Sequence, residues 1–276
     1  MTDRYAVIGN PVAHSKSPFI HAEFAGQTGQ DLIYERVLAP LDGFAATMLN
    51  FRAEGGLGLN ITLPFKLEAF ALAQERSTRA LDAQAVNTLK FEGATIYGDN
   101  TDGIGLVRDI QANLVFPIEG RHVLLMGAGG AAQGAVGMLL DAKPARLVIA
   151  NRTPQKAEQL AARMRRVRGL DAAVLSASGY AELTGRQFDL IINSTSASLN
   201  NAVPELPDGV FARDCLAYDM MYGNGLTPFL EKALTQGAAR LADGIGMLVE
   251  QAAESFFIWR GVRPQTSPVI AALKAR

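Results

Sequence analysis

This chain of 276 residues has little cysteine and little histidine, and neither positive nor negative charge is in clear excess. The single cysteine, Cys215, excludes an internal disulfide, and the three histidines do not combine with it into the spacing of a zinc site. We therefore expect a reducing compartment and no metal centre. The 26 Lys and Arg residues against 27 Asp and Glu residues leave a net charge of −1, which argues against a nucleic-acid binder or a binder of anionic membranes.

Long hydrophobic runs are scarce as well. The apolar run that follows residues 1–4 is too short for a signal peptide. Residues 123–140 carry no charge over a length that can cross a bilayer, but they contain several glycines and Gln133, so a buried strand, turn and helix explain them better. We predict a cytoplasmic protein, either a monomer or a homodimer, that binds a small-molecule substrate and neither nucleic acid nor membrane.

Short β-like runs alternate with helical runs along the chain, which predicts an α/β fold with parallel sheets. Strands are expected at residues 5–9, 32–38, 57–63, 123–126, 147–150, 173–175, 190–192 and 216–218. Helices are expected from about Ser17, with Ser17 as N-cap and Pro18 in the first turn, from about Leu41, over 103–112, up to Leu140, over 246–260 and over 267–274. A loop is expected at 198–207.

The length favours two domains, since a domain takes roughly 150 residues. We place the first at residues 1–102 and 243–276, because no strand separates the two C-terminal helices and we expect them to pack on the first domain. The second domain then covers residues 103–242.

The strongest local signal is a glycine-rich turn. The apolar strand at 123–126 leads into Gly127, Ala128, Gly129, Gly130, Ala131 and Ala132, which fits the G-x-G-x-x-G/A pattern of dinucleotide sites. Glycines there allow a tight turn and a close approach to a pyrophosphate, whose charge meets the free N–H groups at the start of the next helix. The alternative is a turn that serves packing alone.

The residues after the next strand point to the kind of dinucleotide. An NAD site carries an acid about 20 residues on to hold the ribose 2′-hydroxyl. Here the strand at 147–150 ends in Asn151, Arg152 and Thr153, so a guanidinium stands where the acid is expected, and Lys156 adds a second positive charge one turn later. Because a guanidinium grips a phosphate with two hydrogen bonds, the pattern favours NADP over NAD.

Candidate catalytic residues follow the strand at 57–63. Its alternation places Asn60 and Thr62 on one face, where burial in a parallel sheet requires hydrogen-bond partners. Lys66 comes just past the carboxyl end of the strand, where open α/β sheets place their ligands. Asp102 lies at the predicted domain boundary and acts either as an N-cap or as a partner of Lys66 in an ammonium-carboxylate pair suited to proton exchange.

A candidate anion site follows the first strand. Ser15 and Ser17 lie at the start of a helix, and two hydroxyl groups at a helix N-terminus can hold a carboxylate.

As a set, these motifs resemble the shikimate dehydrogenase family, and the resemblance runs nearly end to end. The motifs that carry it are GNP (9–11), HSKSP (14–18), NITLPFK (60–66), AVNT (85–88), GDNTDG (98–103), GAGGA (127–131), NRT (151–153) and ADGIGML (242–248). The resemblance implies an N-terminal α/β substrate domain with a parallel sheet, a Rossmann-type NADP-binding domain, and C-terminal helices that return to the first domain. It implies reversible reduction of 3-dehydroshikimate to shikimate with NADPH, in the pathway to chorismate and the aromatic amino acids.

The resemblance also assigns roles to individual residues. Lys66 and Asp102 become the catalytic pair of an NADP-dependent oxidoreductase that acts on a CH–OH group. The substrate-binding residues it implies are Ser15, Ser17, Asn60, Thr62, Asn87, Tyr222 and Gln251. The cofactor-binding residues it implies are Gly127, Ala128, Gly129, Gly130, Ala131, Asn151, Arg152, Thr153, Lys156, Thr195, Met220, Gly244 and Met247.

Three alternatives stay open at this point. A quinate or dual quinate/shikimate dehydrogenase shares the same motifs, although Arg152 speaks against the NAD that such enzymes often use. A non-catalytic NADP-binding module has no use for Lys66, Asp102 and Asn60 together. A cysteine-based acyl-transferring reductase has only Cys215 as nucleophile, and Cys215 falls in an apolar run typical of a core strand.

Overall fold

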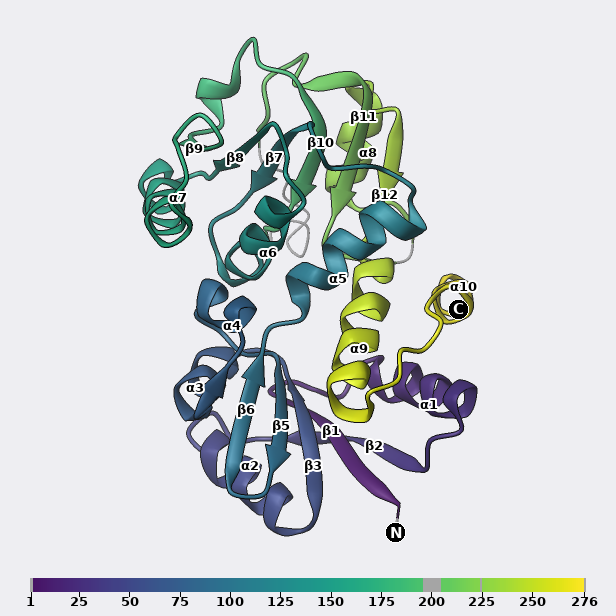
Figure 1. Cartoon of the computed structure of the whole chain (residues 1–276). Helices are drawn as coiled ribbons and strands as arrows, with labels where there is room; N and C mark the ends of the chain where they lie inside the picture. The colour runs from purple at the N-terminus through teal and green to yellow at the C-terminus, as the bar shows by residue number, and fades with distance from the viewer. Residues whose placement is uncertain (1, 196–204, 224, 276) are drawn as a thin grey trace. The chain divides into compact units, whose positions relative to one another are not determined.

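A computed structural model describes residues 2–195, 205–223 and 225–275 (Figure 1). The chain divides into two compact units: unit 1 consists of Met1–Gly105 and Leu248–Arg276, and unit 2 of Leu106–Met247. Of the loop predicted at 198–207, residues 198–204 lie outside the described residues. None of the helices in the described part of the chain has the length and hydropathy needed to span a membrane.

Unit 1 contains a six-stranded sheet in the order β2-β1-β3-β5-β6-β4. β1 pairs in parallel with β2 and β3, and β4 with β6, whereas β5 runs antiparallel to both β3 and β6. The strands are β1 (Asp3–Gly9), β2 (Leu32–Leu38), β3 (Gly56–Ile61), β4 (Glu75–Arg76), β5 (Thr88–Glu92) and β6 (Thr95–Asp99). The α/β class is confirmed, but the antiparallel β5–β6 hairpin differs from the predicted parallel sheet. A two-residue turn closes it, and Gly93 in that turn has φ of 55°.

Helices cover both faces of this sheet. The helices of unit 1 are α1 (Ser17–Thr28), α2 (Phe44–Ala53), α3 (Lys66–Leu72), α4 (Thr78–Ala83), most of α9 (Ile245–Arg260) and α10 (Ser267–Lys274), together with the start of α5 (Asp102–Arg108). On one face, Ile8 and Leu59 pack with Phe44 and Met48 of α2 in a buried cluster. On the other face, Tyr5 stacks on Trp259 of α9 with ring centroids 4.6 Å apart.

Unit 2 contains six strands that all pair in parallel, in the order β12-β11-β10-β7-β8-β9. The strands β7, β8 and β9 follow one another outward from the centre of the sheet. The chain then crosses back to β10, beside β7, and β10, β11 and β12 follow one another outward in the opposite direction. A Rossmann fold binds dinucleotides at the point where the strand order reverses in this way. The strands are β7 (His122–Met126), β8 (Arg146–Ala150), β9 (Leu175–Ser178), β10 (Phe188–Asn193), β11 (Phe211–Asp219) and β12 (Arg240–Ala242). β9 begins two residues later than predicted, and the pattern did not reveal β12.

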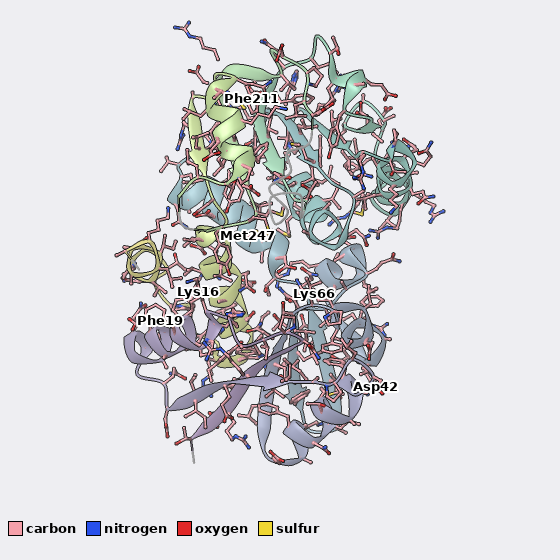
Figure 2. All side chains as sticks on the ribbon, turned by 180° about the vertical axis from the view of Figure 1, so that it is seen from behind. Lys16, Phe19, Asp42, Lys66, Phe211 and Met247 are labelled. Atoms are coloured by element: carbon pink, nitrogen blue, oxygen red, sulfur yellow. The ribbon has the colours of Figure 1, made fainter. Side chains whose placement is uncertain are left out.

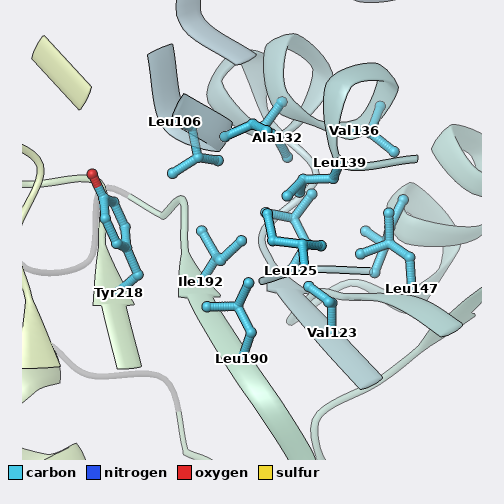
Figure 3. Packing of buried hydrophobic residues seen from close by; sticks show 14 of the residues in the cluster. Leu106, Val123, Leu125, Ala132, Val136, Leu139, Leu147, Leu190, Ile192 and Tyr218 are labelled. Carbon is cyan, nitrogen blue, oxygen red and sulfur yellow. The ribbon is translucent and has the colours of Figure 1, made fainter. Parts of the chain in front are cut away.

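Side chains that alternate along the unit 2 strands contribute to two separate hydrophobic cores, one on each face of the sheet. Val123 and Leu125 point to the side of α6 (Gly130–Asp141) and α7 (Pro154–Arg168), where they pack with Val136 (Figure 3). Leu124 points to the opposite side, where it packs in a cluster with Phe229 of α8 (Pro228–Thr235). Because apolar residues fill both faces, only the strand ends are free for polar side chains.

Candidate functional site

Lys66 is positioned by the end of β3. The backbone N–H of Thr62 donates to the carbonyl of Ile8 at 3.0 Å, and the fully buried ring of Phe65 stacks on Phe44 with centroids 5.0 Å apart. These contacts fix the chain on both sides of Pro64, so α3 begins at Lys66 just past the carboxyl end of the strand (Figure 2). The Lys66 side chain keeps 29% of its surface exposed and is therefore accessible to a ligand.

Lys66 and Asp102 form an ion pair. Lys66 Nζ lies 2.6 Å from Asp102 Oδ2, and the Asp102 side chain is only 14% exposed. The second oxygen, Oδ1, accepts a hydrogen bond from Nδ2 of Asn87 at 2.8 Å. The structure thus brings together three residues predicted for the site. An ammonium group held this way has a fixed position and remaining protons for a reacting oxygen.

The amide of Asn87 has a defined orientation. Asn87 is 3% exposed, and its Oδ1 accepts the backbone N–H of Thr101 at 2.9 Å. A backbone N–H is only a donor, so the oxygen of the amide must face Thr101 and the NH₂ group must face Asp102.

Asn60 is buried and hydrogen-bonded, as its position in the sheet requires. Its Oδ1 accepts from the hydroxyl of Tyr34 at 2.7 Å, and its Nδ2 donates to the hydroxyl of Ser255 at 2.9 Å. Thr62 is half-buried, and its methyl group lies against Gly9, where an added Cβ would approach it to 2.3 Å. Gly9 therefore gives Thr62 its space.

Ser15 and Ser17 lie together at the start of α1. Their hydroxyl oxygens are 3.1 Å apart, and the backbone N–H of Ser17 donates to Ser15 Oγ at 3.2 Å. The prediction of Ser17 as N-cap is wrong by one position, because Lys16 occupies the N-cap without a side-chain cap and Ser17 is the first helical residue. Arg36 donates to the Ser15 carbonyl at 2.6 Å and brings a positive charge to the two hydroxyls.

Gln251 extends from α9 toward the same group of residues. It is half-buried, its Oε1 accepts from the Thr101 hydroxyl at 3.4 Å, and its Nε2 donates to the Leu248 carbonyl at 2.9 Å. Unit 1 therefore holds Asn60, Lys66, Asn87, Asp102 and Gln251 in one set of contacts, linked through Thr101 and Ser255.

In unit 2, the glycine-rich turn leaves a helix N-terminus open. Gly127 has φ of 105°, and an added Cβ would lie 2.7 Å from Ser194 Oγ, so only glycine fits. Gly129 and Gly130 are exposed with nothing within 4 Å of an added Cβ, and Gly129 caps α6 without a side-chain hydrogen bond. Free N–H groups and open space beside them suit a phosphate group.

The second turn of unit 2 presents positive charge. Arg152 and Lys156 are both exposed, at the end of β8 and in the first turn of α7. Asn151 donates through Nδ2 to the Thr153 carbonyl at 2.9 Å, and this hydrogen bond shapes the turn between β8 and α7. Arg152 also lies near Tyr180, whose pKa burial raises to about 12 against the lowering effect of that guanidinium.

The remaining cofactor candidates of unit 2 lie on loops, except Met247, which lies in the first turn of α9. Thr195 donates through its hydroxyl to Asn193 Oδ1 at 2.7 Å. Gly244 packs so tightly on Met220 that an added Cβ would lie 2.1 Å from the Met220 carbonyl oxygen. Met247 packs at the edge of the core cluster around Leu125.

Tyr222 is half-buried on the loop after β11, and burial raises the pKa of its phenol, which keeps the hydroxyl protonated. Tyr222 belongs to unit 2, whereas the other substrate-binding candidates belong to unit 1.

Cys215 does not serve as a nucleophile. It is fully buried in β11, and burial raises the pKa of its thiol to about 12, so the reactive thiolate does not form near neutral pH. Over residues 2–195, 205–223 and 225–275, no group of His, Cys, Asp and Glu side chains is arranged to hold a metal ion.

Sequence reasoning missed four polar residues that hold the site: Tyr34, Arg36, Thr101 and Ser255. Thr101 directly precedes Asp102, and only Asp102 was assigned a role from the sequence. Ser255 follows Gln251 by four residues, so helical periodicity places both on one face of α9, and this spacing is the signal that can find it.

Comparison with known families accounts for most of the chain. Residues 7–89 match the family described as shikimate dehydrogenase substrate binding domain. Residues 110–203 match the family described as shikimate / quinate 5-dehydrogenase, and residues 244–274 match the shikimate 5'-dehydrogenase C-terminal domain.

Individual proteins match over the full length. The chain is 62% identical to the shikimate dehydrogenase (NADP(+)) of Nitrosospira multiformis, with 100% of this chain and 98% of that protein covered. Its fold matches the crystal structure of an Ael1 enzyme from Pseudomonas putida with a TM-score of 0.92 and 53% identity, covering 99% and 98% of the two chains. It also matches the shikimate 5-dehydrogenase of Thermus thermophilus, solved with NADP(H) and shikimate, with a TM-score of 0.85 and 31% identity over 99% of both chains.

Proposed function

The chain belongs to the shikimate dehydrogenase family, and we propose that it catalyses the reversible, NADP-dependent interconversion of shikimate and 3-dehydroshikimate. It is then an oxidoreductase that acts on a CH–OH group, in the pathway to chorismate and the aromatic amino acids. The observation that carries the proposal is the 2.6 Å pair of Lys66 and Asp102, held by Asn87 of the segment that matches the substrate-binding domain family.

Lys66 does the proton chemistry in this proposal. When 3-dehydroshikimate is reduced, its carbonyl oxygen gains negative charge, and the Lys66 ammonium stabilises that charge and donates a proton to the oxygen. In the oxidation direction the neutral amine accepts the proton of the shikimate hydroxyl. Asp102 keeps Lys66 in place, and Asn87 keeps Asp102 in place.

The polar residues around this pair bind and orient the substrate. Ser15 and Ser17 present two adjacent hydroxyls and the start of α1 to the substrate carboxylate, with Arg36 adding positive charge. Asn60, Thr62, Asn87 and Gln251 supply amide and hydroxyl groups that match a ring with several hydroxyls, and Tyr222 supplies a protonated phenol. Such positioning is the main contribution of the protein to the rate.

The residues of unit 2 fit an NADP molecule. The cofactor supplies the hydride. The exposed, uncapped N-terminus of α6 at Gly129, Gly130 and Ala131 receives the pyrophosphate, and Gly127 and Ala128 allow the turn that leads to it. Arg152 and Lys156 receive the 2′-phosphate, with Asn151 and Thr153 shaping the turn, while Thr195, Met220, Gly244 and Met247 line the nicotinamide end.

An assay with two acids and two cofactors tests the function. NADPH or NADH formation is followed by absorbance for shikimate and for quinate, each with NADP⁺ and with NAD⁺. We expect shikimate with NADP⁺ to give the highest kcat/KM. A higher value with quinate would reassign the substrate, and no shikimate-dependent NADPH formation would refute the proposal.

We also propose a cytoplasmic enzyme that is a monomer or a homodimer. The single cysteine, Cys215, excludes an internal disulfide, which fits a reducing compartment. Cell fractionation tests the location, and sedimentation equilibrium of the purified protein tests the oligomeric state.

A further inference from the structure

Ser255 lies at the centre of a buried group of polar side chains in unit 1. It is 0% exposed on α9. Its Oγ lies 2.9 Å from Asn60 Nδ2, 2.8 Å from Thr88 Oγ1 and 3.3 Å from Thr101 Oγ1. It also lies 3.1 Å from the Gln251 carbonyl, one turn earlier on the helix. A single hydroxyl therefore joins the C-terminal helix to three polar side chains of β3, β5 and the segment before α5.

The amides at the two ends of this group have fixed orientations. Asn60 Nδ2 faces the backbone carbonyl of Asn87 at 3.3 Å, and a carbonyl only accepts, so Nδ2 is on that side. The Asn87 amide is fixed by the N–H of Thr101, as described above. Asn60 is thus a donor toward Ser255, and Asn87 Oδ1 is an acceptor.

One arrangement of the hydroxyl protons connects the Asn60 amide with the Asn87 amide. Ser255 accepts from Asn60, and its single proton has two acceptors within reach, the Thr88 hydroxyl at 2.8 Å and the Gln251 carbonyl at 3.1 Å; the chain uses the shorter of the two contacts. Thr88 then donates its only hydroxyl proton to Asn87 Oδ1 at 2.9 Å. The hydrogen bonds run in one direction from Asn60 through Ser255, Thr88 and Asn87 to Asp102, and bonds in such a chain strengthen one another.

We infer that Ser255 is a positioning residue for the reaction, acting through Thr88 and Asn87 on Asp102. The inference rests on the proposed roles of Asn87 and Asp102. Without the Ser255 hydroxyl, Asn60 loses its shortest acceptor and Thr88 is left with the longer hydrogen bond from Asn60 Nδ2, at 3.1 Å, in a buried group of side chains. Thr88 and Asn87 then rearrange, and Asp102 no longer holds Lys66 in the reactive position.

Other contacts hold α9 in place without Ser255. Arg79 joins the helix to the sheet, donating to Glu254 at 2.8 Å and to Asp99 at 2.6 Å. Trp259 donates through Nε1 to the Leu89 carbonyl at 2.9 Å. We therefore expect Ser255→Ala to fold, and thermal unfolding of the purified variant checks this.

The first experiment compares Ser255→Ala with Thr47→Val. Thr47 in α2 donates through its hydroxyl to the Gly43 carbonyl at 2.8 Å, so its hydroxyl lies against the preceding helical turn as that of Ser255 lies against the Gln251 carbonyl, but Thr47 is outside the group. Ser255→Ala is expected to lower kcat/KM for shikimate about tenfold, the loss that one buried hydrogen bond can cause, with KM for NADP⁺ unchanged. Thr47→Val is expected to keep the wild-type kinetics. Wild-type kcat/KM in Ser255→Ala overturns the inference.

The second experiment is a double-mutant cycle with Thr88→Val. If both hydroxyls act through one chain, the double variant falls no further than the worse single variant. Losses that multiply would overturn the inference, because they would show two independent effects. Ser255→Cys extends the test, since a thiol donates weakly, and an intermediate rate is expected. Should Ser255→Ala not fold, a wild-type rate in Ser255→Cys overturns the inference instead.

The outcomes separate this inference from the function. A wild-type enzyme without shikimate-dependent NADPH formation refutes the proposed function and the inference with it. An active wild-type enzyme whose Asp102→Asn variant is equally active refutes the proposed site. An active wild-type enzyme that needs Asp102 but not Ser255 refutes only the inference.

Discussion

Gly105 of α5 and Gln251 of α9 pack against each other with no room for a side chain. A Cβ at Gly105 would lie 2.7 Å from the backbone nitrogen of Gln251 and 2.7 Å from its Cβ. The close approach lets the Gln251 side chain reach Thr101 from another helix. Glycine at position 105 is therefore part of how the substrate-binding candidates are assembled.

Gly105→Ala is expected to weaken shikimate binding. The added methyl group meets backbone atoms, so α9 must shift and Gln251 moves from its position. We expect KM for shikimate to rise about tenfold, the effect of a lost hydrogen bond of about 1.4 kcal/mol, while KM for NADP⁺ stays the same. Steady-state kinetics measure both constants.

Gly26→Ala is the matched control. Gly26 is an exposed glycine in α1, and an added Cβ there meets nothing within 4 Å. Alanine favours a helix over glycine by about 1 kcal/mol, so this variant gains stability and keeps wild-type KM values. Equal KM values for shikimate in both variants would contradict the assigned role of the close packing.

Lys66→Met is expected to remove most of the turnover. Methionine keeps most of the length of the side chain but cannot donate a proton or carry charge. We expect kcat to fall about 100-fold or more, with little change in the Kd of NADPH. The control is Lys90→Met, which breaks another lysine-acid pair, with Glu92 at 2.5 Å on β5, and should leave kcat unchanged. Near-normal turnover of Lys66→Met would remove it from the catalytic pair.

Arg152→Gln is expected to reduce the preference for NADP⁺. The guanidinium is exposed at the end of β8 and is proposed to bind the 2′-phosphate. Loss of a charged hydrogen bond raises KM for NADP⁺ about tenfold to hundredfold, while KM for NAD⁺ is unaffected. Arg166→Gln, an exposed arginine further along α7, serves as control. An unchanged ratio of kcat/KM for the two cofactors would show that Arg152 does not read the phosphate.

His21 is expected to make the protein acid-sensitive. Its ring is fully buried and stacks on Tyr34 with centroids 4.1 Å apart. Burial, which outweighs the opposing contact with Asn60, lowers the pKa of His21 from 6.5 to about 3. As the pH falls below 6.5, His21 binds a proton in the unfolded chain but stays neutral in the folded chain. The free energy of unfolding therefore decreases between pH 6.5 and about 3.

His21→Phe removes this dependence. Below pH 6.5 the wild-type protein is expected to lose about 1.4 kcal/mol per pH unit more than the variant. Urea unfolding of both proteins between about pH 4 and pH 8 measures the slopes, which are independent of any constant packing difference. Parallel curves over the acid range would show that His21 is protonated in the folded state.

The sequence pattern predicted the strands that carry several apolar residues in a row and missed strands that lack such a run. β2 follows its predicted range, and β7 and β8 each differ from theirs by one residue. β5 and β6 carry Lys90, Glu92 and Tyr97 among apolar residues, and β12 has three residues, so none of them gives a clear period. These strands form because neighbouring strands offer them hydrogen bonds, and that information is not local.

The candidate site shows the same limit. Lys66 and Asp102 lie beside turns and helix starts that the sequence marks, so the sequence predicts both as candidate site residues. It also offers their ion pair as one of two roles for Asp102. Ser255 was not found, because its contact with Asn60 joins residues 195 positions apart and no motif marks it. Patterns identify which residues have unusual surroundings, whereas partners from distant segments require the fold.

The return of the chain to unit 1 has a consequence for biosynthesis. β1 obtains Trp259 as a stacking partner, and Asn60 obtains Ser255, only from the last segment of the chain, Leu248–Arg276. Unit 2 is one uninterrupted stretch and is complete while that segment is still inside the ribosome. β1 and β3 are therefore synthesised before unit 2 but acquire these native contacts after it.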